Sequence, residues 1–144
     1  MKRLPFNRIL LILLILVSTL PVLFVYLYGF EDNPPVEFNN LPFPTDKGEY
    51  HPGESIILTL DYCRYTNAPY TRNVRFVDGL VFSVPEQRRG GASVGCRVVD
   101  VISEIIPTSL PPGTYYLSGK NIYHVNTFAD RIVEWTSETF IVLP

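Results

Sequence analysis

The sequence predicts an all-β domain, a sandwich of about seven antiparallel strands, that follows a single transmembrane α-helix. Three observations support this prediction. Residues 9–30 form an apolar run without a charged residue. After this run, short β-branched and aromatic segments recur between proline and glycine turns, without a sustained 3.6-residue apolar period. The roughly 110 residues that remain are enough for one small domain with its own hydrophobic core.

The apolar run has the length and composition of a membrane span. A helix over residues 9–30 rises about 1.5 Å per residue, which is enough to cross a roughly 30 Å hydrocarbon core. Pro21 predicts a kink, which membrane helices tolerate. A cleaved secretory signal is the alternative, but its apolar region would be shorter, and only a weak Val17-x-Thr19 cleavage site is present. We therefore expect a retained signal-anchor that contacts membrane lipid.

The charges on either side of the run predict its orientation. Basic residues precede it and acidic residues follow it: Lys2, Arg3 and Arg8 before, and Glu31 and Asp32 after. The positive-inside rule then predicts a cytoplasmic tail over residues 1–8. Residues 31–35 read as a hydrated spacer, and residues 36–144 as an extracytoplasmic domain in the periplasm or at the cell surface.

The first half of this domain contains two clear strand patterns. Residues 36–43 predict an edge strand that ends at Pro42 and Pro44. The next strand places alternate apolar side chains on one face: Ile56, Leu58, Leu60 and Tyr62. A further set shares one face across Asp78-Gly79, which predicts a hairpin turn or a bulge: Val74, Phe76, Leu80, Phe82 and Val84.

The second half begins with residues 86–95, a loop by composition, and a strand over residues 96–106. The strand after that has its apolar side chains in phase: Tyr115, Leu117, Tyr123 and Val125. In the last strand the phase of Val133 and Trp135 is opposite to that of Phe140 and Val142. A bulge near residues 136–138 would turn both pairs toward one core.

Cys63 and Cys96 are the two cysteines of the chain. In an exported domain such a pair predicts a disulfide, which stabilises a fold by roughly 3–4 kcal/mol for a loop of this length. Two free buried thiols are the alternative. A metal site is not expected, because the cysteines form no Cys-x-x-Cys pair and His51 and His124 have no ligand-like spacing to them.

Two segments, HPGESIILTL over residues 51–60 and LPPGTYYLSG over residues 110–119, resemble immunoglobulin-like and fibronectin type III-like domains of bacterial surface proteins and phages. The resemblance implies an immunoglobulin-like sandwich, with a jelly roll or another small β-barrel as the alternative. It also implies a tyrosine corner. The spacing from Leu110 favours Tyr116 for this corner, whereas the strand phase favours Tyr115.

The chain also departs from the antibody-type pattern. Its tryptophan, Trp135, follows both cysteines instead of lying between them. Cys96 precedes the corner tyrosine, whereas the second cysteine of an antibody-type domain follows it. We therefore expect any disulfide of this chain to differ from the usual bridge between two sheets.

No catalytic or cofactor-binding motif is recognisable in the sequence, so we expect a non-enzymatic protein without cofactor. His51 and His124 read as surface residues. Asp61 and Asp100 would form a carboxylate pair only if the fold brought them together.

Arginines in or near predicted loops form a possible site for an anionic lipid, polysaccharide or phosphate: Arg72, Arg75, Arg88 and Arg89. A solvated loop is the alternative reading. Nucleic acid is not expected, because the net charge is −2 and no aromatic residues interleave with these arginines in a base-stacking pattern.

The expected function is therefore that of a single-pass, membrane-anchored interaction or adhesion module with a protein partner in an envelope or a virion. Small anchored proteins of this kind resemble phage or prophage products, such as a virion membrane component or a host-envelope modifier in superinfection exclusion. The alternative is a small structural subunit of a larger membrane complex, with the helix as its main contact. The sequence leaves the identity of the partner and the oligomeric state open.

Overall fold

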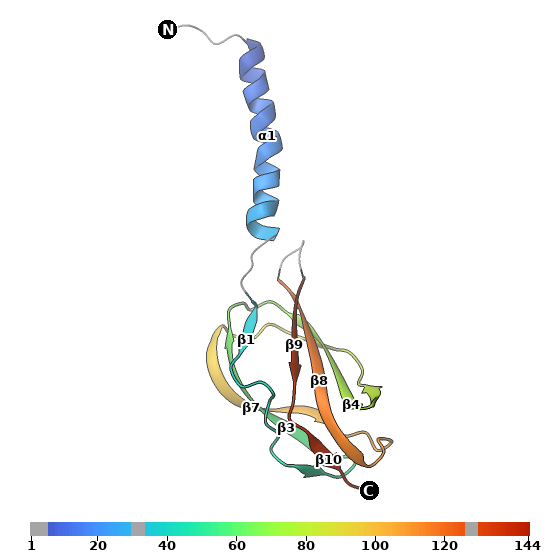
Figure 1. Ribbon diagram of the computed structural model, residues 1–144. Coiled ribbons are helices and arrows are strands. Elements are labelled where there is room, and N and C mark those ends of the chain that lie inside the picture. The colour runs from blue at the N-terminus through green and yellow to red at the C-terminus, as the bar shows by residue number, and fades with distance from the viewer. Residues whose placement is uncertain (1–5, 30–33, 126–129) are drawn as a thin grey trace. The chain divides into compact units, whose positions relative to one another are not determined.

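The computed structural model describes residues 6–29, 34–125 and 130–144 (Figure 1). The chain separates into two compact units, one helical and one built of β-sheet. Most of the predicted cytoplasmic tail and of the predicted spacer, residues 1–5 and 31–33, lies outside the described residues. Pro35, which the sequence assigns to the spacer, is buried in the β unit, and its carbonyl accepts a hydrogen bond from the Tyr65 N–H at 3.0 Å.

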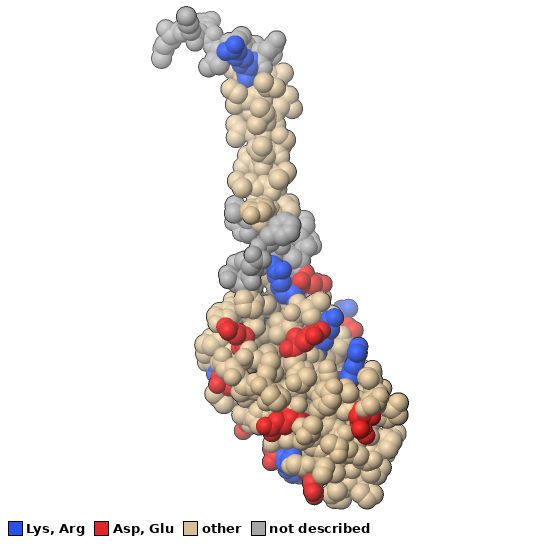
Figure 2. Space-filling model, viewed as in Figure 1, with Lys and Arg blue, Asp and Glu red and all other residues tan. Residues whose placement is uncertain are grey.

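The helix α1 extends over Phe6–Gly29 and continues through Pro21 without interruption. Its Arg8–Tyr26 segment has a mean hydropathy of 2.8, so the helix is long and apolar enough to cross a membrane. Apart from Arg8, the described surface of α1 carries no charged side chain and is tan in Figure 2. The hydroxyl groups of Ser18 and Thr19 donate to the Ile15 carbonyl at 3.0 and 2.8 Å, which satisfies them within an apolar helix.

The described part of the β unit contains ten strands, against about seven predicted. They are β1 Val36–Phe38, β2 Glu49–Tyr50, β3 Ser55–Arg64, β4 Tyr70–Asp78, β5 Leu80–Ser83, β6 Gln87–Arg89, β7 Gly95–Ile105, β8 Gly113–His124, β9 Asp130–Thr136 and β10 Phe140–Val142. The additional strands are short. β6 lies inside the predicted loop 86–95, and an interruption separates β10 from β9.

The strands form two sheets whose facing sides enclose one core (Figure 1). The first sheet has the order β1-β3-β7, and the second has the order β2-β10-β8-β4-β5, with β9 also paired to β8 and β6 also paired to β4. All these pairs are antiparallel except β10 with β2, which is parallel. The prediction of a purely antiparallel arrangement is therefore wrong at this pair, because the chain crosses from the first sheet to the second between β1 and β2.

The predicted alternation of apolar residues is largely confirmed by burial. The core contains the predicted inward residues of β3, β4, β8, β9 and β10: Ile56, Leu58, Val74, Phe76, Tyr115, Leu117, Trp135, Phe140 and Val142. Leu80 is an exception, since it is 70% exposed. It lies at the tip of the β4–β5 hairpin, directly after Gly79, whose φ of 61° provides the turn. Asp78-Gly79 is therefore a hairpin turn rather than a bulge.

The predicted bulge in the last strand is confirmed by the register. Thr136 pairs with Ser118 and Phe140 pairs with Tyr115, so the β9–β10 segment holds one residue more than β8 between these pairs. Ser137 lies in the interruption, and its hydroxyl accepts the Leu117 N–H at 2.8 Å. The additional residue reverses the side-chain phase, which turns both Trp135 and Phe140 inward.

Gly119 interrupts the apolar phase of β8 because Trp135 needs the space. The two residues are direct partners on β8 and β9, and a Cβ atom at position 119 would overlap the indole ring. The indole Nε1–H donates to Asn121 Oδ1 at 3.4 Å. Glycine at position 119 therefore allows the tryptophan to lie flat against the inner side of the second sheet.

A hydrogen bond from a tyrosine hydroxyl to the nearby main chain and the predicted disulfide are both present. Tyr115 is 2% exposed, and its hydroxyl donates to the Pro111 carbonyl at 2.9 Å, whereas Tyr116 is only half-buried. This geometry favours Tyr115, as the strand phase does. Cys63 and Cys96 form a disulfide between directly opposed positions of β3 and β7. The bond therefore lies within one sheet, as the departure from the antibody pattern predicts.

Candidate interaction edge and the adjoining arginine cavity

The free edges of the two sheets differ greatly in length. β1 and β2 have three and two residues. The β5–β6 edge is interrupted near Pro85, and β9 carries charged side chains at Asp130, Arg131 and Glu134. β7 is the longest edge strand in the described ranges, with eleven residues. Natural proteins usually protect such edges by shortness, proline, bulges or charge, and much of β7 lacks these devices.

The register of β3 and β7 identifies which main-chain groups of β7 face the open edge. On β3, the Thr59 N–H donates to the Pro44 carbonyl at 3.2 Å, and the Asp61 carbonyl accepts the Asn39 N–H at 2.8 Å. These β3 residues therefore bond away from β7. Their partners on β7 are Asp100 and Val98, whose main-chain N–H and C=O groups point away from β3, toward the open edge. Every second residue of β7 has the same main-chain direction. The outward set is Cys96, Val98, Asp100 and Ile102.

Two of these four residues present apolar surface to solvent, and Asp100 between them is charged and exposed. Val98 is 67% exposed and Ile102 is 65% exposed on the outer side of the first sheet. The structure describes no main-chain hydrogen bond between the outward set and another described segment. The stretch Cys96–Ile102 is thus open to pairing with a further strand.

A bulge ends this open stretch. Ile102 pairs with Ile57 and Glu104 pairs with Ile56, which leaves Ser103 as an additional residue on β7. As a result, both Ser103 and Glu104 point inward and are buried, with 4% and 6% exposure. Neither residue was predicted from the sequence to belong to a site. The signal that the sequence contained is the polar Ser103-Glu104 pair within an otherwise alternating apolar strand.

The bulge brings Glu104 to Arg72 of the second sheet. Arg72 Nη2 donates to Ser103 Oγ at 2.5 Å and lies 3.7 Å from Glu104 Oε1. The Arg72 guanidinium also lies over the Trp135 ring, 5.2 Å from its centroid. Glu104 Oε1 is buried and makes no hydrogen bond in the described structure. The ion pair is therefore incompletely satisfied by the chain's own groups.

Burial sets the electrostatics of this pair. It raises the pKa of the Glu104 carboxyl, and the charges of Arg72 and Arg89 oppose part of that rise. Burial also lowers the pKa of the Arg72 guanidinium, and the negative charge of Glu104 opposes that change. Each charge is thus costly to bury and is held in place by the other.

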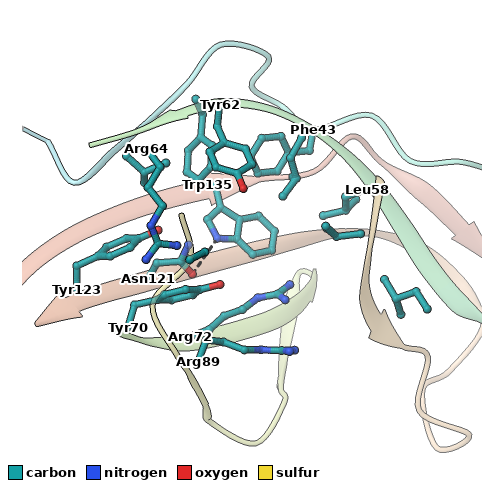
Figure 3. A pocket seen from close by; sticks show the side chains of 16 residues that line it. Phe43, Leu58, Tyr62, Arg64, Tyr70, Arg72, Arg89, Asn121, Tyr123 and Trp135 are labelled. Atoms are coloured by element: carbon teal, nitrogen blue, oxygen red, sulfur yellow. Dashed lines mark hydrogen bonds between the residues drawn. The ribbon is translucent and has the colours of Figure 1, made fainter. Parts of the chain in front are cut away.

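A cavity of about 210 Å³ lies between the two sheets beside this pair (Figure 3). Arg72 and Arg89 lie side by side and extend into it, with Trp135 next to Arg72. Among the described residues, no aspartate or glutamate lines this cavity. A second hollow of about 450 Å³ shares Arg89 and Ile102 with the first and also contacts Glu104.

Arg64, at one side of the cavity, has a structural role. Its guanidinium lies 5.4 Å from the ring centroids of both Tyr70 and Tyr123, which stack on each other. It donates to the carbonyls of Thr66 and Ala68, each at 2.7 Å. Burial raises the pKa of the Tyr123 hydroxyl to about 12. Arg64 therefore connects this wall of the cavity to the carbonyls of the following loop.

The four arginines of the predicted anionic site do not form one cluster. Arg72 and Arg75 lie on β4, and Arg88 and Arg89 lie on the short strand β6 inside the predicted loop 86–95. Pairing of Tyr70 with Arg89 places Arg89 on the cavity side together with Arg72. Because side chains alternate, Arg75 and Arg88 face the other way. On the face shown in Figure 2, acidic and basic side chains of the β unit are interspersed.

The two histidines remain exposed, and His124 Nδ1 lies 2.8 Å from Asp130 Oδ1. Asp61 and Asp100 lie at diagonal positions of the β3–β7 ladder, but each bonds a different neighbour. Asp61 accepts the Asn39 amide at 3.0 Å, and Asp100 accepts the Thr59 hydroxyl at 2.6 Å. Within the described residues, no group of three potential metal ligands is present.

Comparison with known proteins does not assign this chain to a family. No protein-family model and no curated protein matches it. One solved structure that it resembles is a Pseudomonas fluorescens alkylpurine DNA glycosylase AlkC bound to DNA containing an abasic site analog. The sequence identity is 13% and the TM-score is 0.34, over 72% of this chain and 31% of that chain. A likeness at this level carries no argument about function.

Proposed function

We propose that the β unit is an immunoglobulin-like domain. Three features support this assignment. In the second sheet, β5 extends the row β10-β8-β4 by one strand. Variable-type immunoglobulin domains extend one sheet beyond its three central strands in the same way. The N-terminal segment of the unit contributes β1 to the first sheet and β2 to the second sheet. Tyr115, near the start of β8, bonds back to Pro111.

We further propose that the chain is a non-enzymatic, single-pass interaction module with its N-terminus in the cytoplasm and its β unit in the periplasm or at the cell surface. The apolar helix α1 supports the anchor, and the disulfide supports an oxidising compartment. The observation that carries the interaction role is the open stretch Cys96–Ile102 of β7, with its unpaired main chain and exposed Val98. The partner is a protein of the envelope or of a virion.

Site-specific photo-cross-linking tests this function. A photoreactive amino acid in place of Val98 should cross-link the full chain, in the host membrane, to an envelope or virion protein that mass spectrometry identifies. The same substitution at Ile132 of β9, which is 55% exposed, serves as the matched control and should give no product. Equal products from both positions, or none from position 98, would contradict the proposed function.

A further inference from the structure

We propose that β7 accepts an extended segment of the partner protein, and that this segment inserts one acidic side chain between the sheets, against Arg72 and Arg89. The inference rests on the proposed function, and it specifies the chemistry of the partner. It follows from three properties of the open edge: the face on which the side chains of an added strand would lie, the positive charge at the cavity, and the absence of an acid among the inward side chains of the open stretch.

The first property decides where the side chains of an added strand would lie. In an antiparallel pair, residues directly opposite one another share a face of the sheet. On β7, the side chains of Arg97, Val99 and Val101 alternate with the exposed outward set and therefore face the second sheet. Residues of an added strand opposite these three would also face inward. Val101 lines the cavity together with Arg72 and Arg89, so the cavity lies within reach of those inward side chains.

The second property is an excess of positive charge. Arg72 pairs with one buried carboxylate, Glu104, whereas Arg89, which is exposed where it lines the cavity, has no acidic partner within 4 Å among the described residues. The hydrogen bonds that the structure describes for Arg72 use Nη2, and Arg89 Nη2 donates to the neutral Gln87 amide oxygen at 2.6 Å. Further guanidinium N–H groups are thus available, and an arginine binds a carboxylate through two parallel hydrogen bonds. A carboxylate from the partner would neutralise the positive charge of Arg89.

The third property distinguishes a partner strand from a second copy of this chain. Two copies of β7 in antiparallel register would contribute Arg97, Val99 and Val101 as their inward side chains over the open stretch. This set contains no acid, and it would bring further positive charge toward Arg89. Charge complementarity therefore favours a different protein whose strand carries an inward acid.

Peptide binding to the full chain in lipid nanodiscs tests this inference. The probes are two fluorescent nonapeptides of alternating valine and threonine, with a central glutamate or a central lysine in one valine position. We expect the glutamate peptide to bind at least tenfold more tightly, as measured by fluorescence anisotropy. Arg89→Glu should reverse this preference. Arg88→Glu, on the same strand but facing away from the cavity, is the matched control and should leave it unchanged.

A second variant separates the inference from the proposed function. Val98→Pro removes a main-chain N–H that faces the open edge and not β3, so it should block strand addition while the fold is kept. It should abolish binding of both peptides. Equal binding of both peptides that Val98→Pro abolishes would overturn the acidic site and leave the interaction edge standing.

Three further outcomes overturn the inference. Binding that Val98→Pro does not reduce would place the peptides elsewhere and would contradict the interaction edge as well. Dimers of the full chain that Val98→Pro dissociates, without binding of the glutamate peptide, would identify a second copy as the occupant. Failure of both peptides to bind at millimolar concentration, without such dimers, would show that no strand of this chemistry adds to β7.

Discussion

Two edges of the β unit face each other across the arginine cavity, and they are protected very differently. The β5–β6 edge is short and broken. Ser83 pairs with Arg75 and Gln87 pairs with Arg72, so it holds one additional residue near Pro85. β7 instead is continuous, and its protection is limited to the exposed charge of Asp100, the bulge at Ser103 and the inward carboxylate of Glu104. One edge is thus closed to strand addition along its length, and the other is closed only at one end.

The largest expected effect concerns the two sides of β7 itself. Val99 directs its N–H toward Leu60 of β3, whereas Val98 directs its N–H toward the open edge. Val99→Pro should therefore lower the free energy of unfolding more than any other variant proposed here, because it removes a ladder hydrogen bond between β7 and β3. Val98→Pro should lower the free energy of unfolding far less, because its N–H makes no hydrogen bond to β3. Urea denaturation of both variants measures the difference, and equal losses would show that β7 is not an edge strand.

The disulfide gives the second largest effect, since it ties the start of β7 to β3. Replacing both Cys63 and Cys96 by serine should lower the free energy of unfolding by about 3 kcal/mol. The Tm of the exported protein under non-reducing conditions measures this loss. The wild-type protein in reductant is the control and should match the variant. An unchanged Tm would mean that the main-chain hydrogen bonds between β7 and β3 stabilise this pair without a contribution from the disulfide.

The floor of the cavity provides a third test. Gly119→Ala would place a Cβ atom in the indole of Trp135 and should cost about 2 kcal/mol through overpacking. Gly48→Ala, where no atom lies within 4 Å of an added Cβ, is the matched control. Trp135 fluorescence should shift in the first variant and remain constant in the second. Loss of peptide binding together with this shift would show that the position of Trp135 in the cavity affects strand addition to β7.

A smaller effect is expected from pH, and it concerns the inward carboxylate that closes one end of the edge. The folded-state pKa of Glu104 lies above its ordinary value of 4.5, so the folded state holds this proton more tightly than the unfolded state. Its contribution to stability is present below pH 4.5 and is lost as pH rises through the raised pKa. Glu104→Gln cannot ionise, so its Tm should decrease less than that of the wild type between pH 4 and pH 8. Parallel Tm profiles would show that burial does not raise the pKa of Glu104.

The smallest effect should come from α1. If the interaction resides on β7, replacement of Phe6–Gly29 by an unrelated membrane helix should leave the cross-link from position 98 unchanged. Loss of that cross-link in a correctly inserted chimera would indicate that the helix is the main contact, as in a subunit of a membrane complex. A chimera that carries the photoreactive amino acid at Ile132 instead of position 98 provides the negative control.

Local patterns in the sequence predicted much of the fold. The period-2 alternation of Ile56 and Leu58 identified an inward face, and the phase reversal after Trp135 predicted the bulge. The number of strands and the parallel β2–β10 pair were missed. Very short strands carry no periodicity, and their pairing depends on segments that are distant in the sequence.

The candidate site was predicted less well than the fold. The sequence identified Arg72 and Arg89 but grouped them with Arg75 and Arg88, which face the opposite side of the second sheet. Glu104 was not identified, because its inward direction depends on the register of β7 against β3. A one-residue change of register turns a strand side chain to the other face, so neither contact could be derived from composition.

The sequence by itself determined the apolar helix, the all-β character of the remainder, the pairing of its two cysteines and the phase of most core residues. These properties depend on residue types at local spacings. Only the tertiary structure decided which strand lies at an edge, which arginines face the cavity and where Glu104 points. These properties arise from pairing between segments tens of residues apart, which local periodicity does not encode.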